Sequence, residues 1–165
     1  MDHLWSPWRY RYIQSADADG ACIFCQKAAE HKDEENLIVF RGARNFVILN
    51  LFPYTTGHLM VAPYEHVDTL DRADEVTAAE MMVLMRAAQT HLGSIYNAHG
   101  FNLGMNLGVA AGAGIAGHIH MHVLPRWRGD ANFMSVIGET RVMPEELGET
   151  YRKLKAAWAQ AASSI

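Results

Sequence analysis

The sequence has little of what builds disulfide-rich, membrane-spanning or nucleic-acid-coating proteins. It contains two cysteines in 165 residues, too few for a disulfide framework. Its longest purely apolar runs, such as 81–85, are far shorter than a membrane span, which needs about 20 residues. It also lacks a basic excess, since its formal net charge is -4. This balance argues against a nucleic-acid coat and against binding to anionic membranes.

The N-terminus lacks the basic start and apolar run of a secretory signal. We therefore expect a cytoplasmic location. In that compartment Cys22 and Cys25 are expected to be a metal clip or a redox pair rather than a structural disulfide.

The length suits one domain over residues 1–165, with a hydrophobic core large enough to be stable without cross-links. We expect an N-terminal arm over residues 1–21, rich in aromatic residues, which covers the core or meets a partner. A capping box at Thr77–Glu80 predicts a long helix that starts there or one turn earlier. Pro144 predicts the start of a C-terminal helix over 144–162. Between these helices and before them we expect strands at 36–41, 45–51, 58–63, 101–108 and around residue 120, which together make an α+β fold.

Three histidines alternate with apolar residues in a single heptad. Because a period of two is typical of a half-buried strand, we expect His118, His120 and His122 to share one face while Ile119 and Met121 point into a core. Imidazole can exchange a proton near neutral pH, attack as a nucleophile or bind a metal. The alternative is an ordinary polar strand face whose histidines have structural partners.

Cys22-Ile-Phe-Cys25 has the spacing of half a zinc site. Tetrahedral zinc needs four ligands, and the chain has no second cysteine pair. Histidines would have to complete the set, and spacing alone does not choose among His31, His58, His66, His91, His99 and His118. The alternative is a pair of thiols that are merely adjacent.

A loop of small residues, 109–117, directly precedes the histidines. Loops without bulky side chains let backbone N–H groups approach a phosphate closely. Trp127, just after the histidines, offers a flat surface on which a base could stack. Together these features favour a site for a phosphorylated ligand.

The heptad His118-Ile-His-Met-His-Val-Leu124 resembles the motif that names the histidine-triad (HIT) family. Segment 50–66 resembles the family's upstream block, and 100–106 resembles the strand before its phosphate loop. Leu-Trp-Ser-Pro-Trp-Arg near the N-terminus and segment 125–133 resemble the bacterial diadenosine tetraphosphate phosphorylases, or ATP adenylyltransferases. The likeness covers residues 4–158. It implies an antiparallel sheet of about five strands, flanked by a long central helix and a C-terminal helix, in a homodimer or higher homo-oligomer.

The resemblance also implies roles for single residues. His120 would be the nucleophile that carries a nucleotidyl group, His122 would orient or polarise the phosphate, and His58 would lie behind the nucleophile. The implied substrate contacts are Asn50 to the ribose, Trp127 near the base, and, for the phosphates, Asn106 with the backbone of Gly112, Ala113 and Gly114.

The resemblance extends to a metal. Some bacterial members, and the related galactose-1-phosphate uridylyltransferases, hold a structural zinc with a Cys-x-x-Cys and two histidines. Carried over, this pattern gives Cys22, Cys25, His66 and His118, and leaves His120 and His122 for catalysis. One departure concerns the loop, because many members carry Gln or Ser where this chain has Gly114 and Ile115. Backbone groups and a water or inorganic phosphate would have to serve instead.

The implied function is a nucleotidyl transferase or hydrolase that cleaves dinucleoside polyphosphates. Diadenosine tetraphosphate and inorganic phosphate would give ADP and ATP, and any magnesium is expected with the nucleotide. The expected partners are an adenine nucleotide or dinucleoside polyphosphate and phosphate, with no nucleic acid and no membrane. The alternatives are a HIT-type hydrolase of adenosine phosphoramidates or other small nucleotides, and a zinc-stabilised nucleotide-binding module without turnover.

Overall fold

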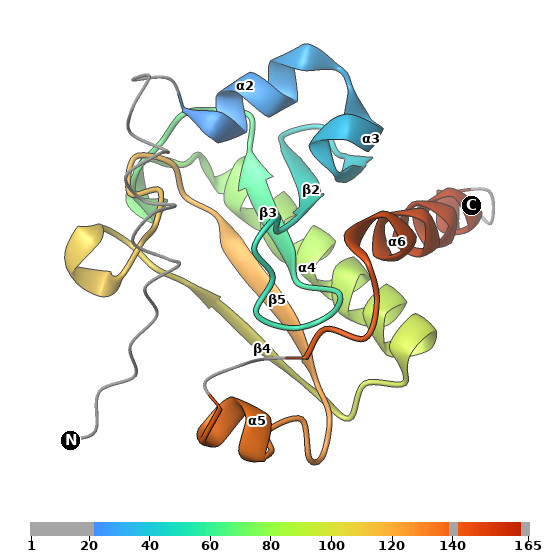
Figure 1. The fold of residues 1–165 in the computed structure, drawn as a ribbon. Helices are drawn as coiled ribbons and strands as arrows, with labels where there is room; N and C mark the ends of the chain where they lie inside the picture. The colour runs from blue at the N-terminus through green and yellow to red at the C-terminus, as the bar shows by residue number, and fades with distance from the viewer. Residues whose placement is uncertain (1–21, 139–141, 163–165) are drawn as a thin grey trace.

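A five-stranded antiparallel sheet forms the centre of the fold in the computed structural model, which describes residues 22–138 and 142–162. The strand order is β1-β2-β3-β5-β4, and every neighbouring pair is antiparallel. The predicted α+β class with an antiparallel sheet is confirmed (Figure 1). The arm predicted over residues 1–21 lies outside the described residues. The strands are β1 (Ile38–Arg41), β2 (Asn45–Leu49), β3 (Leu59–Pro63), β4 (Gly100–Met105) and β5 (Met121–Arg126).

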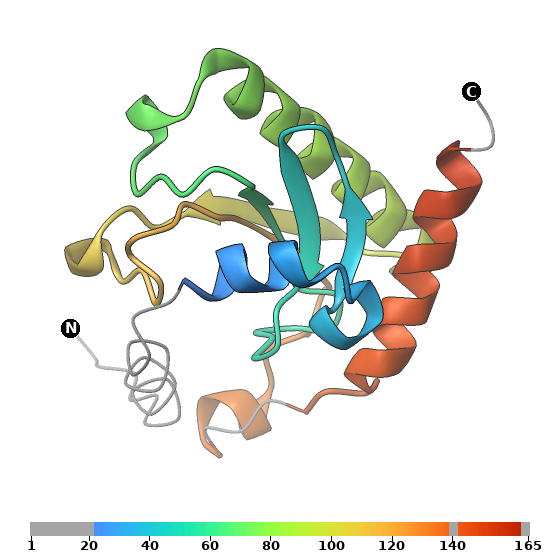
Figure 2. The ribbon, with the colours of Figure 1, turned by 90° about the horizontal axis from the view of Figure 1, so that it is seen from above.

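Helices cover both faces of the sheet. As Figures 1 and 2 show, α4 and α6 lie on one face, and α2 lies on the other. The helices are α2 (Ile23–Glu30), α3 (Asp33–Asn36), α4 (Glu75–Tyr96), α5 (Phe133–Val136) and α6 (Leu147–Ala162), with short 3₁₀ turns at η1 (Leu70–Arg72) and η2 (Val109–Ala111). Among the described helices, none combines the length and the apolar character needed to cross a membrane.

The central strands are apolar on both sides because both sides are covered. All five residues of β2 are buried. Val47 and Leu49 pack into the core that includes α4 and α6, whereas Phe46 and Ile48 pack with Phe24 of α2. Alternate side chains of a strand point to opposite faces, so each layer of the core receives every second residue of the strand.

The start of α4 is fixed by Asp74 rather than by Thr77. The Asp74 carboxylate accepts the Thr77 N–H at 2.7 Å, and the helix begins at Glu75. Of the two predicted starts, the earlier one is therefore correct. Glu80, the acidic residue of the supposed capping box, instead accepts the backbone N–H groups of Ala43, Arg44 and Asn45. It thereby ties the β1–β2 hairpin to α4.

Several other boundaries differ from the sequence-based predictions. Strand β2, predicted to reach residue 51, ends at Leu49, and β4, predicted over 101–108, ends at Met105. Asn36 ends the short helix α3 and does not begin a strand, since Leu37 adopts a left-handed conformation with φ 61° before β1. Phe133, where the sequence predicted no helix or strand, begins the one-turn helix α5. The last helix starts at Leu147, three residues after Pro144. In each case local hydrogen bonding that the apolar pattern does not reveal sets the boundary.

The turn between β2 and β3 is pinned against α4 at a glycine. Gly57 has φ +76°, and a Cβ there would lie 2.7 Å from Leu92 Cδ2 of α4. Only glycine combines this backbone conformation with so close an approach. The turn carries Asn50 at its start and His58 at its end, so this contact also positions the site described next.

Candidate active site and metal cluster

The three histidines of the heptad do not all lie on a strand. His118 and His120 precede β5, and only His122 belongs to it. The predicted continuous strand is therefore wrong for the first two histidines. Ile119 donates its N–H to the Val67 carbonyl at 2.8 Å, outside the sheet ladder, and its side chain is buried in the core as predicted.

Phe24 of α2 covers the first two histidine rings. Its ring centroid lies 5.2 Å from that of His118 and 4.9 Å from that of His120. These two histidines are only 1% and 6% exposed. Instead of an open polar face, the heptad therefore presents two enclosed imidazoles beside a third, His122, at the start of β5.

One ring nitrogen of His120 is committed to the backbone. Nδ1 lies 2.9 Å from the carbonyl oxygen of His118, which can only accept, so Nδ1 carries the proton in the neutral ring. The lone pair is then on Nε2. Burial lowers the pKa of His120, although the bond to the His118 carbonyl opposes this shift. A neutral imidazole with a lone pair on Nε2 can act as a nucleophile.

A chain of hydrogen bonds fixes the proton of His122. The Tyr54 N–H donates to His58 Nδ1 at 3.1 Å, so the His58 proton lies on Nε2. His58 Nε2 is 2.8 Å from His122 Nδ1, which therefore accepts. The proton of neutral His122 lies on Nε2, where it can be donated to a ligand oxygen.

His58 stays neutral in this chain. It is fully buried, and burial lowers its pKa to about 3, with the nearby His122 and His120 rings adding to the shift. A protonated His58 would carry a proton on Nδ1 and lose the Tyr54 hydrogen bond. His58 therefore acts on the tautomer of His122 and holds it in one state.

His120 and His122 line a cavity, which we call the histidine cavity. Ile23, Phe24 and Lys27 of α2 form one wall, and Asn50 to Phe52 form another. Asn50 lies beside His58, with 3.3 Å between its Nδ2 and His58 Nδ1, and its Oδ1 accepts the Phe52 N–H.

The small-residue loop offers fewer amides to this cavity than its composition suggests. The N–H groups of Gly112 and Ala113 donate to Val109 and Gly108 carbonyls within the loop. Gly114 lines the histidine cavity, and within the described chain no backbone carbonyl accepts its N–H. Asn106 also lines the cavity, and its Nδ2 lies 3.5 Å from the Gly112 carbonyl oxygen.

Trp127 lies away from the histidine cavity. It is not among the residues that line the histidine cavity. It lines a second cavity together with Thr55, Thr56 and Tyr96.

The two cysteines and two of the histidines form one cluster. The ligand atoms of Cys22, Cys25, His66 and His118 all lie within 4.8 Å of one another. Cys22 and Cys25 flank the start of α2, His66 follows β3, and His118 ends the small-residue loop. The spacing left six histidines open as possible metal ligands. The fold brings two of them, His66 and His118, to the cysteines, and these are the two that the resemblance implied.

The geometry of the cluster fits a tetrahedral metal. The Sγ–Nδ1 distances are 3.3 Å (Cys22–His118), 3.4 Å (Cys25–His66) and 3.6 Å (Cys25–His118). Tetrahedral zinc with ordinary bond lengths would separate sulfur and nitrogen ligands by ~3.6 Å. His118 Nε2 lies 2.9 Å from the Pro63 carbonyl oxygen, so Nδ1 carries the lone pair that a metal needs.

The ionisation of the cluster also suits a cation. Burial lowers the pKa of His118 to about 4, so the ring is neutral. Burial raises the pKa of Cys25 to about 11, and the adjacent Cys22 adds to the rise. Two thiols held this close favour a divalent cation, which stabilises their thiolate forms. These four residues can therefore bind a metal.

The sequence did not indicate three of the residues that contribute to the site. Phe24 packs against two histidine rings, Lys27 lines the histidine cavity, and Tyr54 orients His58 through its backbone N–H. Phe24 lies within the Cys-x-x-Cys segment, and Lys27 lies one helical turn after Ile23. A helical reading of residues 23–30 would have put Ile23, Phe24 and Lys27 together on one face, because residues three or four apart are neighbours on a helix. The role of Tyr54 depends on its backbone and leaves no such signal.

Known proteins share this fold and these motifs. The HIT domain family model matches residues 31–129. The "AP-4-A phosphorylase" of Mycobacterium tuberculosis is 40% identical over 97% of this chain and 86% of its own.

Solved structures agree. A Zn-bound histidine triad family protein from Mycobacterium smegmatis superposes with a TM-score of 0.71 at 27% identity, over 88% of this chain and 99% of that one. A hypothetical histidine triad nucleotide-binding protein from Sulfolobus tokodaii gives 0.67 at 26% identity, over 87% and 93%. The family match, the relative and the arrangement of the histidines agree: this chain belongs to the HIT domain family.

Proposed function

We propose that this chain cleaves dinucleoside polyphosphates by phosphorolysis, through a nucleotidyl intermediate on His120. The observation that carries the proposal is the arrangement of ring nitrogens in one cavity, with a lone pair on His120 Nε2 and a proton on His122 Nε2. The 40% identity to the mycobacterial AP-4-A phosphorylase, over nearly the whole chain, supports the substrate class.

The first step transfers an adenylyl group to the protein. The His120 Nε2 lone pair attacks the α-phosphorus of diadenosine tetraphosphate, so a P–N bond forms. The bond from that phosphorus to the bridging oxygen breaks, and the oxygen leaves with its electron pair as part of ATP. His122 Nε2–H would donate to a phosphate oxygen as negative charge develops there.

The second step regenerates the histidine. An oxygen of inorganic phosphate attacks the same phosphorus, the P–N bond breaks, and its electron pair returns to Nε2. The product is ADP. With water in place of phosphate the product would be AMP, so the acceptor alone distinguishes phosphorylase from hydrolase.

Polar groups around the cavity would hold the substrate for this attack. Asn50 is suited to ribose hydroxyls, because its amide lines the cavity beside His58. Asn106 and the Gly114 N–H would contact phosphate oxygens at the loop side. The apolar wall of Ile23, Phe24 and Leu51 would contact the nucleoside and exclude water from the reacting phosphorus.

Product analysis tests the proposal directly. Purified protein is incubated with diadenosine tetraphosphate, with and without inorganic phosphate, and the nucleotides are separated by anion exchange. We expect ADP and ATP in equal amounts, and only when phosphate is present. AMP and ATP regardless of phosphate would favour a hydrolase, and cleavage of adenosine phosphoramidates alone would favour the other enzymatic alternative. Bound AMP without cleavage of either substrate would favour a binding module.

We infer further that the metal of the cluster is zinc and that its role is structural. The two-thiolate, two-imidazole set matches zinc chemistry, and the Mycobacterium smegmatis relative is Zn-bound. All four positions are taken by protein ligands, so the metal would hold α2 against the histidine segment. A magnesium ion would enter with the polyphosphate as part of the substrate. Elemental analysis showing no zinc in protein purified without chelator would refute the inference.

We also infer a homo-oligomer in the cytoplasm. The outer edge of β4 pairs with no other described strand, and Leu103 on it is 46% exposed. Exposed edge strands commonly pair with another chain. Both cysteines are free of disulfides and arranged as metal ligands, which favours a reducing compartment. Light scattering that gives the monomer mass would contradict the oligomer.

A further inference from the structure

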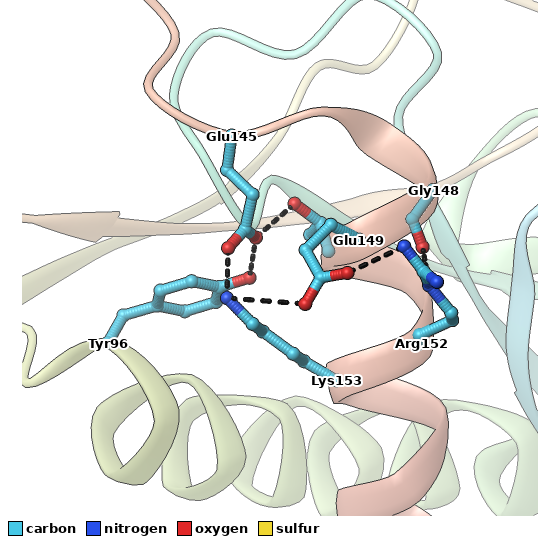
Figure 3. Close-up of polar contacts among 7 residues, drawn as sticks. Tyr96, Glu145, Gly148, Glu149, Arg152 and Lys153 are labelled. Carbon is cyan, nitrogen blue, oxygen red and sulfur yellow. Dashed lines mark hydrogen bonds and ion pairs between the residues drawn. The ribbon is translucent and has the colours of Figure 1, made fainter.

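The titratable side chains around Glu145 and those around the two cysteines are paired in different ways. The Glu145 carboxylate accepts the Tyr96 and Thr150 hydroxyls at 2.6 and 2.7 Å and is also paired with Lys153 (Figure 3). Its charge is therefore compensated within the chain, and its contacts tie the segment before α6 to the end of α4. This cluster explains local structure and leaves no group for further chemistry.

The two cysteines keep a reactive group in addition to their role as metal ligands. Both are free of disulfides and partly exposed, and their sulfurs lie within 4.8 Å of each other. Cys22 is the N-cap of α2, and Cys25 follows in the first turn of that helix. A Cys-x-x-Cys pair in which the thiols stand at a helix N-terminus is the arrangement that disulfide oxidoreductases use.

The first turn of α2 is attached to the protein differently from its last turn. Among residues 23–30, all of which the structure describes, Phe24 alone is buried. It lies between the two cysteines in the chain, and its ring centroid is 4.9 Å from that of His120. The far end of the helix is held by a hydrogen bond instead, from Arg41 Nη1 to the Ala28 carbonyl at 2.8 Å. The first turn can therefore shift while the last turn stays in place.

We propose that Cys22 and Cys25 form a redox-active dithiol, which a small-molecule disulfide such as glutathione disulfide oxidises to an intrachain disulfide when no metal is bound. Oxidation leaves the cluster with its two imidazoles alone, so the oxidised chain does not hold the metal. Closing the bond also draws the two ends of the first turn together, which moves Phe24 relative to His120. The cluster thus alternates between a reduced, metal-binding state and an oxidised, metal-free state.

The oxidation consists of two thiol–disulfide exchanges. The Cys22 thiolate attacks one sulfur of glutathione disulfide, and one glutathione leaves with the electron pair of the broken S–S bond. The Cys25 thiolate then attacks Cys22 Sγ, and the second glutathione leaves in the same way. The two cysteine protons end on the two glutathione thiols, so the cysteine pair loses the two electrons that glutathione disulfide gains. Cys22 attacks first, because burial raises the pKa of Cys25 to about 11.

Thiol counting on the full chain tests the proposal without any nucleotide. The chain is stripped of metal with chelator, equilibrated in glutathione buffers of increasing oxidised fraction, alkylated and weighed by mass spectrometry. It has only two cysteines, so the number of alkyl groups identifies the redox state. We expect two alkylated thiols in reducing buffer and none in oxidising buffer, at the mass of one chain without glutathione. In Cys25→Ser the reaction should stop at a single glutathione adduct.

Zinc should oppose this oxidation, because it binds the dithiol and not the disulfide. The ratio of glutathione disulfide to squared glutathione at half-conversion should rise at least tenfold with zinc in excess, which is about 30 mV for a two-electron couple. His66→Asn is a matched control, because it keeps both thiols and removes an exposed histidine of the cluster. It should oxidise like the metal-free wild type and gain less protection from zinc.

Nuclear magnetic resonance tests the movement of Phe24. The ring signals of His120 should shift between the reduced and oxidised metal-free chains, because the Phe24 ring packs against it. The ring signals of His91, which packs against Trp158 of α6, should stay in place.

Two reactive thiols at every glutathione ratio, a wild-type chain that stops at the glutathione adduct, or disulfides between chains would each overturn the dithiol. Equal oxidation with and without zinc would overturn the alternation between the two states, and unchanged His120 signals would overturn the movement of Phe24. A negative cleavage assay would refute the proposed function and leave these results standing.

Discussion

His118 and His120 lie two residues apart, are both buried, and both direct one ring nitrogen at a backbone carbonyl, yet they use opposite nitrogens. His118 Nε2 meets the Pro63 carbonyl, which leaves Nδ1 facing the thiols of the metal cluster. His120 Nδ1 meets the His118 carbonyl, which leaves Nε2 at the histidine cavity. The ring nitrogen that hydrogen-bonds to a backbone carbonyl leaves the lone pair on the other nitrogen. The position of that lone pair thus decides whether a histidine of this segment can bind the metal or attack a phosphorus.

The largest expected effect comes from His120→Asn. Loss of the Nε2 lone pair should lower kcat/KM for diadenosine tetraphosphate by roughly 10⁴- to 10⁶-fold. Metal content and melting temperature should stay near those of the wild type, because His120 is outside the cluster. Steady-state kinetics, elemental analysis and calorimetry on one preparation check all three. Substantial remaining activity would show that His120 is not the nucleophile.

The corresponding variant in the metal cluster is His118→Asn. It should lose bound metal, and the free energy of unfolding should fall by on the order of 3 kcal/mol. Urea unfolding with and without chelator measures the loss, and chelator should destabilise the wild type but not the variant. His31→Asn is a suitable control, because His31 is exposed and left-handed (φ 53°), a conformation that Asn tolerates. Full metal content in His118→Asn would remove His118 from the ligand set.

A smaller effect is expected when His58 is replaced by Gln. The hydrogen bond that holds the proton of His122 on Nε2 would be lost or reversed, so kcat should fall roughly tenfold to a hundredfold. KM should change little, and metal content should not change. A rise in KM without a fall in kcat would assign His58 to substrate binding instead.

The pH dependence of stability gives the smallest but most selective test. The pKa of His58 is about 3 in the folded chain, against 6.5 for an ordinary exposed histidine, so the unfolded state binds more protons between these values. Stability is therefore full above pH 6.5 and falls as the pH drops below it, by about 1.4 kcal/mol per pH unit from this residue.

The comparison of wild type with His58→Gln isolates that contribution, because acid also protonates the metal ligands in both. Urea unfolding from about pH 7 to about pH 5, with zinc in excess, should give a shallower slope in the variant. Parallel slopes in the two proteins would mean that His58 is not held neutral by burial.

Much of the fold could be predicted from periodicity, because the pattern reports burial. Both faces of β2 and β3 are apolar because both are covered, and the apolar stripe on α4 lies against the sheet. Boundaries are harder to predict. The left-handed Leu37 and the cap at Asp74 depend on single hydrogen bonds and backbone angles. His118 and His120 alternate as in a strand, but backbone pairing to Val67 removes that segment from the sheet.

The candidate site likewise contains some residues that the sequence reveals and others that it does not. Residues with reactive side chains, such as His120 and the two cysteines, stand out because few other side chains do their chemistry. Tyr54 and Pro63 act through backbone groups, and those are invisible in a sequence. The small-residue loop suggests several free amides, but two of them close hydrogen bonds within the loop. The family resemblance puts Trp127 near the base, and only the fold shows that it lines a different cavity from His120 and His122.

Helix α2 has a consequence for the energetics of the whole protein. The same eight-residue element follows Cys22, carries Cys25, packs Phe24 against two histidine rings and supplies a wall of the histidine cavity. A metal at its first turn and a nucleotide along its side therefore both favour the docked position of one helix. By thermodynamic linkage, each would raise the affinity for the other by the same factor. On the zinc assignment proposed above, cells short of zinc would then lose nucleotide turnover at substrate concentrations that the metal-loaded protein handles easily.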